Sequence, residues 1–335
     1  MAVSSDWLDR VTEEAIEPDR PIIDPHHHLW DHPGHRYMLD ELLADTRSGH
    51  NIVATVFVEC MAMYRQDGPE SLRSLGETEF VNGVAAQSAS GLYGPIRAAA
   101  GIVGYADLRL GKAVDGVLEA HIARAPDRFR GIRHASGFDP SPDVRDSHTN
   151  PPDGLLADAV FREGFARLAA HGLSFDAWLY HRQIPELTAL ARAFPETTII
   201  LDHFGGPLGI GPYEGKRQEI FEVWKNDITE LAKNPNVVAK LGGIAMAVNG
   251  FGWHRRETPP GSRELMEATR DYYLHAIDRF GPSRCMFESN FPVDKLSCSY
   301  GVLWNSFKRL AEGFSEAEKT DLFFGTANRV YRLGL

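Results

Sequence analysis

The chain has 335 residues, 43% of them hydrophobic, and a formal net charge of −11. This length suits one large α/β domain, and the apolar fraction excludes a disordered chain. An acidic surface repels phosphate backbones and anionic lipid, so we expect neither nucleic acid nor a membrane as a partner. Residues 1–20 are charged throughout and contain no apolar segment of the kind found in signal peptides, so we expect an N-terminal extension on a cytoplasmic protein.

Short apolar runs recur along the chain, separated by longer stretches that are typical of helices. The runs are Pro21–Asp24, Ile52–Glu59, Ala99–Tyr105, Phe129–His134, Leu173–Tyr180, Thr197–Asp202, Asn236–Leu241 and Arg284–Glu288. Strands of a parallel sheet are apolar almost without interruption because both faces of the sheet are buried. Helices are predicted over Glu77–Ser88, Ile184–Ala193, Gly215–Leu231, Leu265–Phe280 and Ser315–Ala327.

Eight strands with intervening helices predict a single-domain (β/α)8 barrel over residues 1–335. The alternative is an open, doubly wound sheet, but no glycine fingerprint follows the first strand. The segment Ser136–Asp153 is rich in Pro and Asp, and we expect it to be a long surface loop after the fourth strand. The three cysteines fit neither a zinc site nor a disulfide framework by their spacing.

The first predicted strand runs into three consecutive histidines, His26, His27 and His28. Residues i and i+2 of a strand point to the same face, so His26 and His28 share one face. Two imidazoles at the end of a strand can bind one divalent metal ion, because imidazole is a common ligand of zinc and its neighbours. A polar pocket that holds the same two histidines by hydrogen bonds, without metal, is equally compatible with this spacing.

A further histidine, His203, follows the sixth predicted strand where it meets a glycine-rich loop. In a barrel of parallel strands the carboxyl ends meet at one face, and the chemistry collects there. We therefore expect His203 to join His26 and His28 at one centre, with these three side chains as the candidate metal ligands.

The eighth predicted strand brings Glu288 and Asn290 onto one face by the same alternation, with Glu288 one pleat deeper. Asn290 is neutral and cannot act as a base. Glu288 can act as a base, and we expect burial to raise its pKa toward a range that is useful for a general base. The alternative for Glu288 is a buried ion pair with Arg133 or Lys240.

Polar side chains at other strand ends, and in the loops that follow them, are candidates for binding a substrate. They are Glu59, Tyr64, Arg65, Arg133, Tyr180, His181, His254 and Arg255. Arginine presents a planar fork that suits a carboxylate, so Arg65 and Arg255 are candidate anion clamps. Charged side chains inside a barrel are rarely buried unless they are paired, so we expect Arg133, Asp176 and Lys240 to belong to a network of both signs.

The chain resembles the amidohydrolase-related branch of the amidohydrolase superfamily, which contains sugar lactonases, muconolactone hydrolases and pyrone-dicarboxylate lactonase. The motifs that carry the resemblance are Asp24-Pro25-His26-His27-His28, Leu201-Asp202-His203-Phe204-Gly205-Gly206-Pro207 and Glu288-Ser289-Asn290-Phe291-Pro292. Their order and spacing match from about Pro21 to Leu335. The resemblance implies a distorted (β/α)8 barrel that hydrolyses a small cyclic ester at its mouth.

This sequence departs from the family pattern at one position. An aspartate at the end of the eighth strand normally deprotonates the reacting water in this branch, and Asn290 stands at the matching place. Two mechanisms are therefore open. In the first, one divalent ion, zinc or manganese, sits on the three histidines, with Asn290 or water completing its shell. In the second, no metal binds, a histidine or Glu288 is the base, and Arg133 or the other histidines stabilise the oxyanion.

The leading hypothesis is a lactone hydrolase acting on a small molecule that bears a carboxylate. A nonoxidative decarboxylase of the same superfamily is a second possibility, although it usually needs a carboxylate metal ligand where Asn290 stands. A barrel that only binds a ligand is a third, and the retained histidines and Glu288 argue against it. A homo-oligomer is compatible with the sequence.

Overall fold

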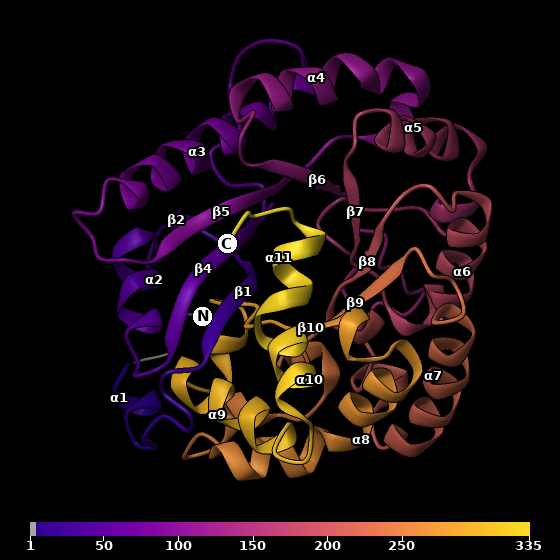
Figure 1. Cartoon of the computed structure of the whole chain (residues 1–335). Coiled ribbons are helices and arrows are strands. Elements are labelled where there is room, and N and C mark those ends of the chain that lie inside the picture. Colours follow the sequence, from indigo (N-terminus) through magenta and orange to yellow (C-terminus); the bar gives the residue numbers. More distant parts are fainter. Residues whose placement is uncertain (1–4) are drawn as a thin grey trace.

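The computed structural model describes residues 5–335, and in this part of the chain eight parallel strands curl into a nearly closed barrel (Figure 1). The strands are β1 (Pro21–His27), β4 (Asn51–Val58), β5 (Arg97–Gly104), β6 (Phe129–Arg133), β7 (Ser174–Ala177), β8 (Ile199–Leu201), β9 (Val237–Leu241) and β10 (Cys285–Phe287). Neighbouring strands of the sheet follow one another in the sequence. The predicted (β/α)8 barrel is confirmed.

The barrel closes between β10 and β1 through the residues that follow β10. The backbone N–H of His28 donates to the carbonyl oxygen of Phe291 at 2.8 Å, and the N–H of Asn290 donates to that of His26 at 3.0 Å. The pairing of β1 with β4 also shifts register after Ile22 and after Asp24. These irregularities distort the barrel at the edge that carries the histidines.

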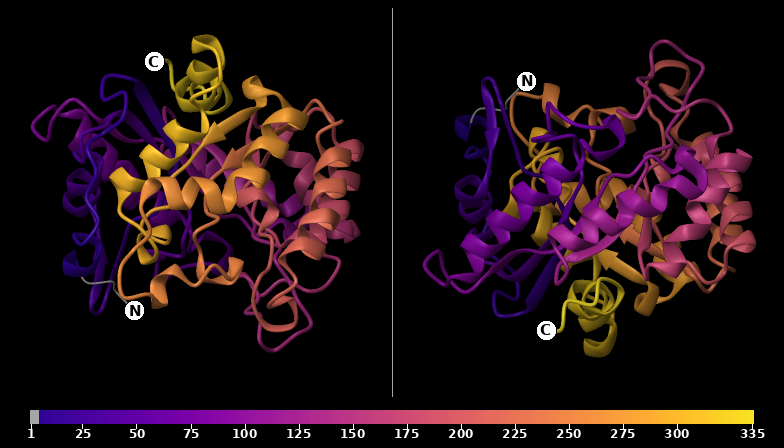
Figure 2. Two further views of the ribbon diagram at one scale, coloured as in Figure 1. Left: turned by 90° about the horizontal axis from the view of Figure 1, so that it is seen from below. Right: turned by 90° about the horizontal axis from the view of Figure 1, so that it is seen from above.

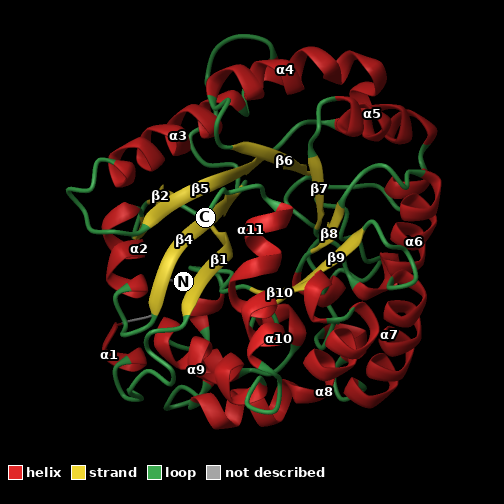
Figure 3. Ribbon diagram, in the orientation of Figure 1, coloured by secondary structure: helices red, strands yellow, loops and turns green. Residues whose placement is uncertain are grey.

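Helices surround the barrel and cover the outer face of the sheet (Figure 3). They include α2 (Leu39–Thr46), α3 (Leu75–Ala89), α4 (Asp115–Arg124), α5 (Ala159–Ala170), α6 (Ile184–Ala193), α7 (Arg217–Leu231), α8 (Ser262–Phe280) and α9 (Tyr300–Leu310). In α8 the buried positions Leu265, Tyr272, Ala276 and Phe280 recur at helical spacing, so one face packs against the barrel and the other stays in water. None of the helices in residues 5–335 is long and apolar enough to cross a membrane.

The C-terminal helical segment closes one end of the barrel (Figure 1). It comprises α10 (Glu316–Thr320), one π-helical turn (Asp321–Gly325) and α11 (Thr326–Val330), where the sequence predicts one helix. Tyr331 then enters the barrel, where its buried hydroxyl donates to Asp176 at 2.6 Å. Figure 2 shows this segment projecting at the end opposite to the loops near residues 150 and 210. The other end is therefore the open one.

The N-terminal segment and a short hairpin lie beside the barrel. The hairpin pairs β2 (Trp30–His32) with β3 (His35–Tyr37). Of the predicted N-terminal extension 1–20, residues 1–4 lie outside the described part. The rest begins with α1 (Ser5–Leu8) and packs along α8 and α9, where the backbone N–H of Ile16 donates to Asn305 at 2.8 Å.

Candidate active site

The three predicted histidines meet at the carboxyl ends of the strands. His26 lies in β1, His28 follows it, and His203 begins the 3-10 turn His203–Gly205 directly after β8. The Nε2 atoms of His26 and His28 are 3.3 Å apart, and the ring centroids of His26 and His203 are 4.4 Å apart. All three side chains are buried. His203 has a φ of 52°, a backbone strain of the kind that often marks functional sites.

The carboxylate of Glu288, just after β10, joins two of these rings. Its Oε1 accepts from His203 Nδ1 at 2.7 Å, and its Oε2 lies 2.9 Å from His26 Nδ1. The Nδ1 of His28 faces the carbonyl oxygen of Val58 at 2.8 Å. A neutral imidazole with an acceptor at Nδ1 carries its proton there. His28 and His203 therefore each offer an unprotonated Nε2, whereas Nδ1 of His26 also faces the Lys240 ammonium at 3.2 Å.

The pKa of Glu288 is lowered, whereas we predicted that burial would raise it. Burial alone raises the pKa of this carboxyl, but the charges and hydrogen bonds of His203 and His26 more than offset burial and hold it at about 2. The expectation of a raised pKa was wrong because the partners of Glu288 come from β1 and β8. A carboxylate held so firmly in its ionised form orients histidines and is a poor proton acceptor.

Burial lowers the pKa of His26 and of His28 well below the usual value, and the charges of Lys240 and Arg133, respectively, add to the effect. Both rings therefore stay neutral at neutral pH. A neutral imidazole is the form that binds a metal ion or accepts a proton.

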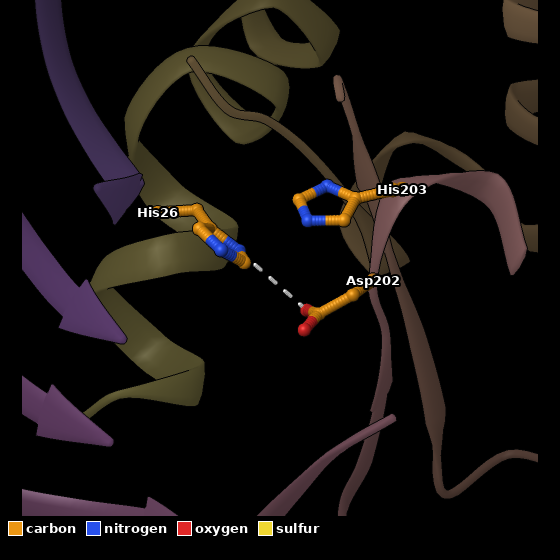
Figure 4. Close-up of side chains that lie close together, drawn as sticks. All are labelled: His26, Asp202 and His203. Atoms are coloured by element: carbon orange, nitrogen blue, oxygen red, sulfur yellow. Dashed lines mark ion pairs between the residues drawn. The ribbon is translucent and has the colours of Figure 1, made fainter. Parts of the chain in front are cut away.

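Asp202, the last residue before His203, completes a cluster that suits a metal ion (Figure 4). Its carboxylate lies 3.7 Å from His26 Nδ1, and donor atoms of His26, Asp202 and His203 all lie within 4.8 Å of one another. Two imidazoles and one carboxylate are ligands that zinc and similar ions take. The same carboxylate faces two cations, Lys240 at 3.1 Å and Arg133 at 3.7 Å, so a bound ion would share it with them.

The charges around this cluster also fit a divalent ion. Among the buried carboxylates near the histidines, four face two permanent cations: Glu59, Asp176, Asp202 and Glu288 against Arg133 and Lys240. The carboxylates exceed the cations by two, and buried charge is costly unless it is compensated. An added dication compensates it.

The predicted network of inward charges is confirmed beneath the histidines. Lys240, in β9, lies 2.6 Å from Asp176 and 3.1 Å from Asp202. Arg133, at the end of β6, donates from Nε to Glu59 at 2.7 Å. Its Nη1 lies 3.4 Å from His26 Nε2. The alternative that paired Glu288 with Arg133 or Lys240 is wrong in its partners, because histidines take that place.

Asn290 is held by an aspartate four residues further along the chain. Its side-chain nitrogen donates to Asp294 at 2.9 Å, which assigns the amide nitrogen to Asp294 and leaves the amide oxygen for the cavity. Burial raises the pKa of Asp294 to about 7. Asp294 lies seven residues beyond the end of β10 and was not predicted, because strand alternation gives no information so far past the strand.

A cavity of about 550 Å³ opens above the histidines. The predicted residues among its lining side chains are His28, Arg133, Tyr180, His203 and Asn290. Its other polar and aromatic lining residues include Trp30, Arg145, Asp146, Ser147, His148 and Trp178. The loop Ser136–Asp153 supplies four of these. It was predicted as a surface loop, but it folds over the mouth because buried Val144 packs with Tyr180 and Leu208.

The remaining predicted binding residues lie elsewhere. Arg65 is paired with Glu79 on α3, and Arg255 is exposed outside this cavity, as is partly exposed His254. His181 is buried and accepts the backbone N–H of Leu208 at 3.3 Å. None of these four side chains lines this cavity.

Two further predicted binding residues lie near the mouth without lining this cavity. Glu59 lies below the cavity against Arg133. Tyr64 lines a neighbouring cavity of about 550 Å³.

Comparisons with known proteins agree with this architecture. The model of the amidohydrolase family matches residues 23–333. The protein y4mH of Sinorhizobium fredii is 34% identical, over 94% of this chain and 99% of its own length. An L-fucono-1,5-lactonase of Burkholderia multivorans is 31% identical, over 70% of this chain and 72% of its own.

A solved structure extends the likeness to three dimensions. The crystal structure of an amidohydrolase from Burkholderia multivorans with bound zinc matches with a TM-score of 0.71 and 27% identity, and the match covers 93% of this chain and 99% of that one. The family match spans nearly all of the barrel, including the strand ends that carry the histidines. The chain therefore belongs to the amidohydrolase family.

Proposed function

We propose that the protein is a hydrolase that opens a small, carboxylate-bearing cyclic ester by attack of water in the histidine-lined cavity. One observation carries the proposal. His203 lines the cavity and is bound at Nδ1 to a buried carboxylate, so its Nε2 is the free acceptor. Similarity to an L-fucono-1,5-lactonase supports a lactone as the substrate.

Glu288 and His203 act together as the base. Glu288 fixes the tautomer and direction of His203, as the carboxylate does in hydrolytic triads, and it stabilises the imidazolium that forms. Water in the cavity gives a proton to His203 Nε2 as its oxygen attacks the ester carbonyl. Proton transfer to a positioned histidine contributes ~10²–10⁴-fold to the rate.

Arg133 and Arg145 provide the positive charge that the substrate needs. Arg133 Nε is taken by Glu59, while Nη1 faces the histidine cluster and can donate to the oxyanion of the tetrahedral intermediate. Arg145 lines the cavity and forms no ion pair within residues 5–335. An unpaired guanidinium at a cavity suits a carboxylate of the substrate.

His26, Asp202 and His203 would hold a divalent ion, with zinc the favoured candidate because a related amidohydrolase binds it. His203 Nε2 would then be a ligand of the ion, so the role of His203 as proton acceptor applies to the site without the ion. When bound, such an ion would polarise the carbonyl and lower the pKa of water. With or without a bound ion, Arg133 and Lys240 lie beside the site and keep its carboxylates ionised.

A panel of aliphatic, sugar and carboxylate-bearing lactones, including L-fucono-1,5-lactone, tests this function through acid release followed with a pH indicator. Each lactone is assayed with and without added zinc, so that a missing ion cannot hide activity. We expect ring opening of at least one carboxylate-bearing lactone. Release of carbon dioxide from aromatic carboxylic acids, with every lactone untouched, would instead identify a decarboxylase.

A substitution at Gly243 tests whether catalysis depends on the position of His203. It has a φ of 68°, and a Cβ added there would lie 2.2 Å from His203 Nδ1. We expect Gly243→Ala to lower kcat by ~100-fold, because small displacements of a catalytic group cost that much. Gly215 has a φ of 76° with open space around it, so Gly215→Ala carries similar backbone strain and controls for it. Equal kcat values for the two variants would show that His203 need not sit where it does.

A further inference from the structure

A second histidine–carboxylate pair borders the cavity. His148, in the loop Ser136–Asp153, places Nε2 3.0 Å from Oε1 and 3.1 Å from Oε2 of Glu59. Glu59 is fully buried, and Arg133 Nε donates to it at 2.7 Å. Burial alone raises the pKa of Glu59, but His148 and Arg133 more than offset this and hold it at about 2. An anchored carboxylate therefore fixes the ring of His148 from one side.

His148 is far more accessible than the other histidines of the site. About 26% of its side chain is exposed, against 3% for His203 and none for His26. It lines both the main cavity and the neighbouring one, whose lining also includes Met61, Tyr64, Arg73, Tyr105, Arg109 and Leu110. Because Nε2 faces Glu59, Nδ1 is the nitrogen left for the cavities. It has no hydrogen bond within residues 5–335.

Opening an ester requires two proton transfers. One proton leaves the attacking water, and another must reach the oxygen of the breaking C–O bond, because an alkoxide is a poor leaving group unless it is protonated. The pair Glu288–His203 follows β10 and β8, whereas the pair Glu59–His148 comes from β4 and the loop after β6. The two pairs thus enter the same cavity from different elements, as a separate base and acid would.

We propose that His148 is a catalytic residue, the general acid that protonates the leaving oxygen; this assignment rests on the proposed lactone hydrolysis. The C–O bond to water forms as a proton passes to His203 Nε2. The ring C–O bond then breaks as Nδ1 of the His148 imidazolium gives its proton to the ring oxygen, yielding a hydroxy acid. Exchange with solvent water returns the proton to His148 and removes the one on His203.

The position of His148 also orients the substrate. The ring oxygen lies toward His148, so a substituent on the adjoining carbon extends into the neighbouring cavity. Exposed Met61 and Leu110 line that cavity together with Arg73, which forms no ion pair within residues 5–335, and with the carboxylates of Glu70 and Asp107.

Leaving-group chemistry tests the assignment. Dihydrocoumarin expels a phenoxide, which needs little protonation, whereas δ-valerolactone expels an alkoxide, which needs it. We expect His148→Gln to lower kcat for δ-valerolactone by ~100-fold and for dihydrocoumarin by less than about 5-fold. His171→Gln is the matched control, because His171 is bound to Asp115 at 2.9 Å and does not line the cavity. It should leave both rates unchanged.

The outcomes separate the two claims. An equal loss on both lactones, or no loss on either, overturns the acid role of His148 and leaves lactone hydrolysis standing. A wild-type protein that opens neither of these lactones nor any member of the wider panel overturns the hydrolase function and the acid role together. Circular dichroism of the His148→Gln protein confirms that a loss of rate is not a loss of fold.

Discussion

His203→Gln is expected to lower kcat for lactone opening by ~10²–10⁴-fold, the range that a positioned proton acceptor contributes. Glutamine keeps a polar side chain near Glu288 but cannot take a proton from water. The neighbouring carboxylate still has His26 at 2.9 Å, so the fold should remain intact. Steady-state kinetics on the best lactone of the panel measures the effect.

Glu288→Gln should cost nearly as much, because an amide no longer fixes the proton of His203 on Nδ1. Residues that act as one unit are not additive, so the double variant should be little worse than His203→Gln alone. His275→Gln is the control, because His275 lies on α8 and bonds to the carbonyl oxygen of Lys225. A His203→Gln protein with near-wild-type kcat would refute the role of His203.

Lys240→Met is expected to lower the free energy of unfolding by about 3–5 kcal/mol, the cost of breaking a buried ion pair by removing one partner. Lys240 is fully buried with Asp176 and Asp202. Burial alone lowers the pKa of its ammonium, but these two carboxylates more than offset that and raise it, so the side chain stays charged. Methionine fills the space and leaves both carboxylates without their cation.

Urea denaturation measures this change against a surface control. Lys233→Met removes a lysine that is 62% exposed and paired with Glu230, and such pairs contribute less than about 1 kcal/mol. Adding Asp176→Leu to Lys240→Met should recover part of the loss, because one of the two orphaned carboxylates is then removed. A Lys240→Met protein as stable as Lys233→Met would show that the buried network is not needed for the fold.

Most of the barrel could be predicted from the sequence. Parallel strands bury both faces, so each strand stands out as an apolar run, and every one of the eight predicted runs overlaps an observed strand. The predicted helix Ile184–Ala193 matches α6 to the residue, since Pro185 favours the first turn and Pro195 follows its end. Strand ends were less exact: β8 covers Ile199–Leu201 within the predicted Thr197–Asp202.

The site was predictable where strand geometry applies. Side chains alternate along β1, and the strands end at one face of the barrel, so we could predict that His26, His28 and His203 lie together. The same reasoning placed Glu288 beside them. Alternation gives no information about loops, so His148 and Arg145 were not found within the segment Ser136–Asp153. The pKa of Glu288 was predicted in the wrong direction because it depends on contacts between strands distant in sequence.

Turnover of a lactone in heavy-oxygen water tests the central claim most directly. If water activated by His203 attacks the ester carbonyl, mass spectrometry will find one heavy oxygen atom in the carboxylate of the ring-opened product and none in its new hydroxyl group. A label in the hydroxyl group, or none anywhere in the product, would contradict hydrolysis at the acyl carbon and with it the account of this site.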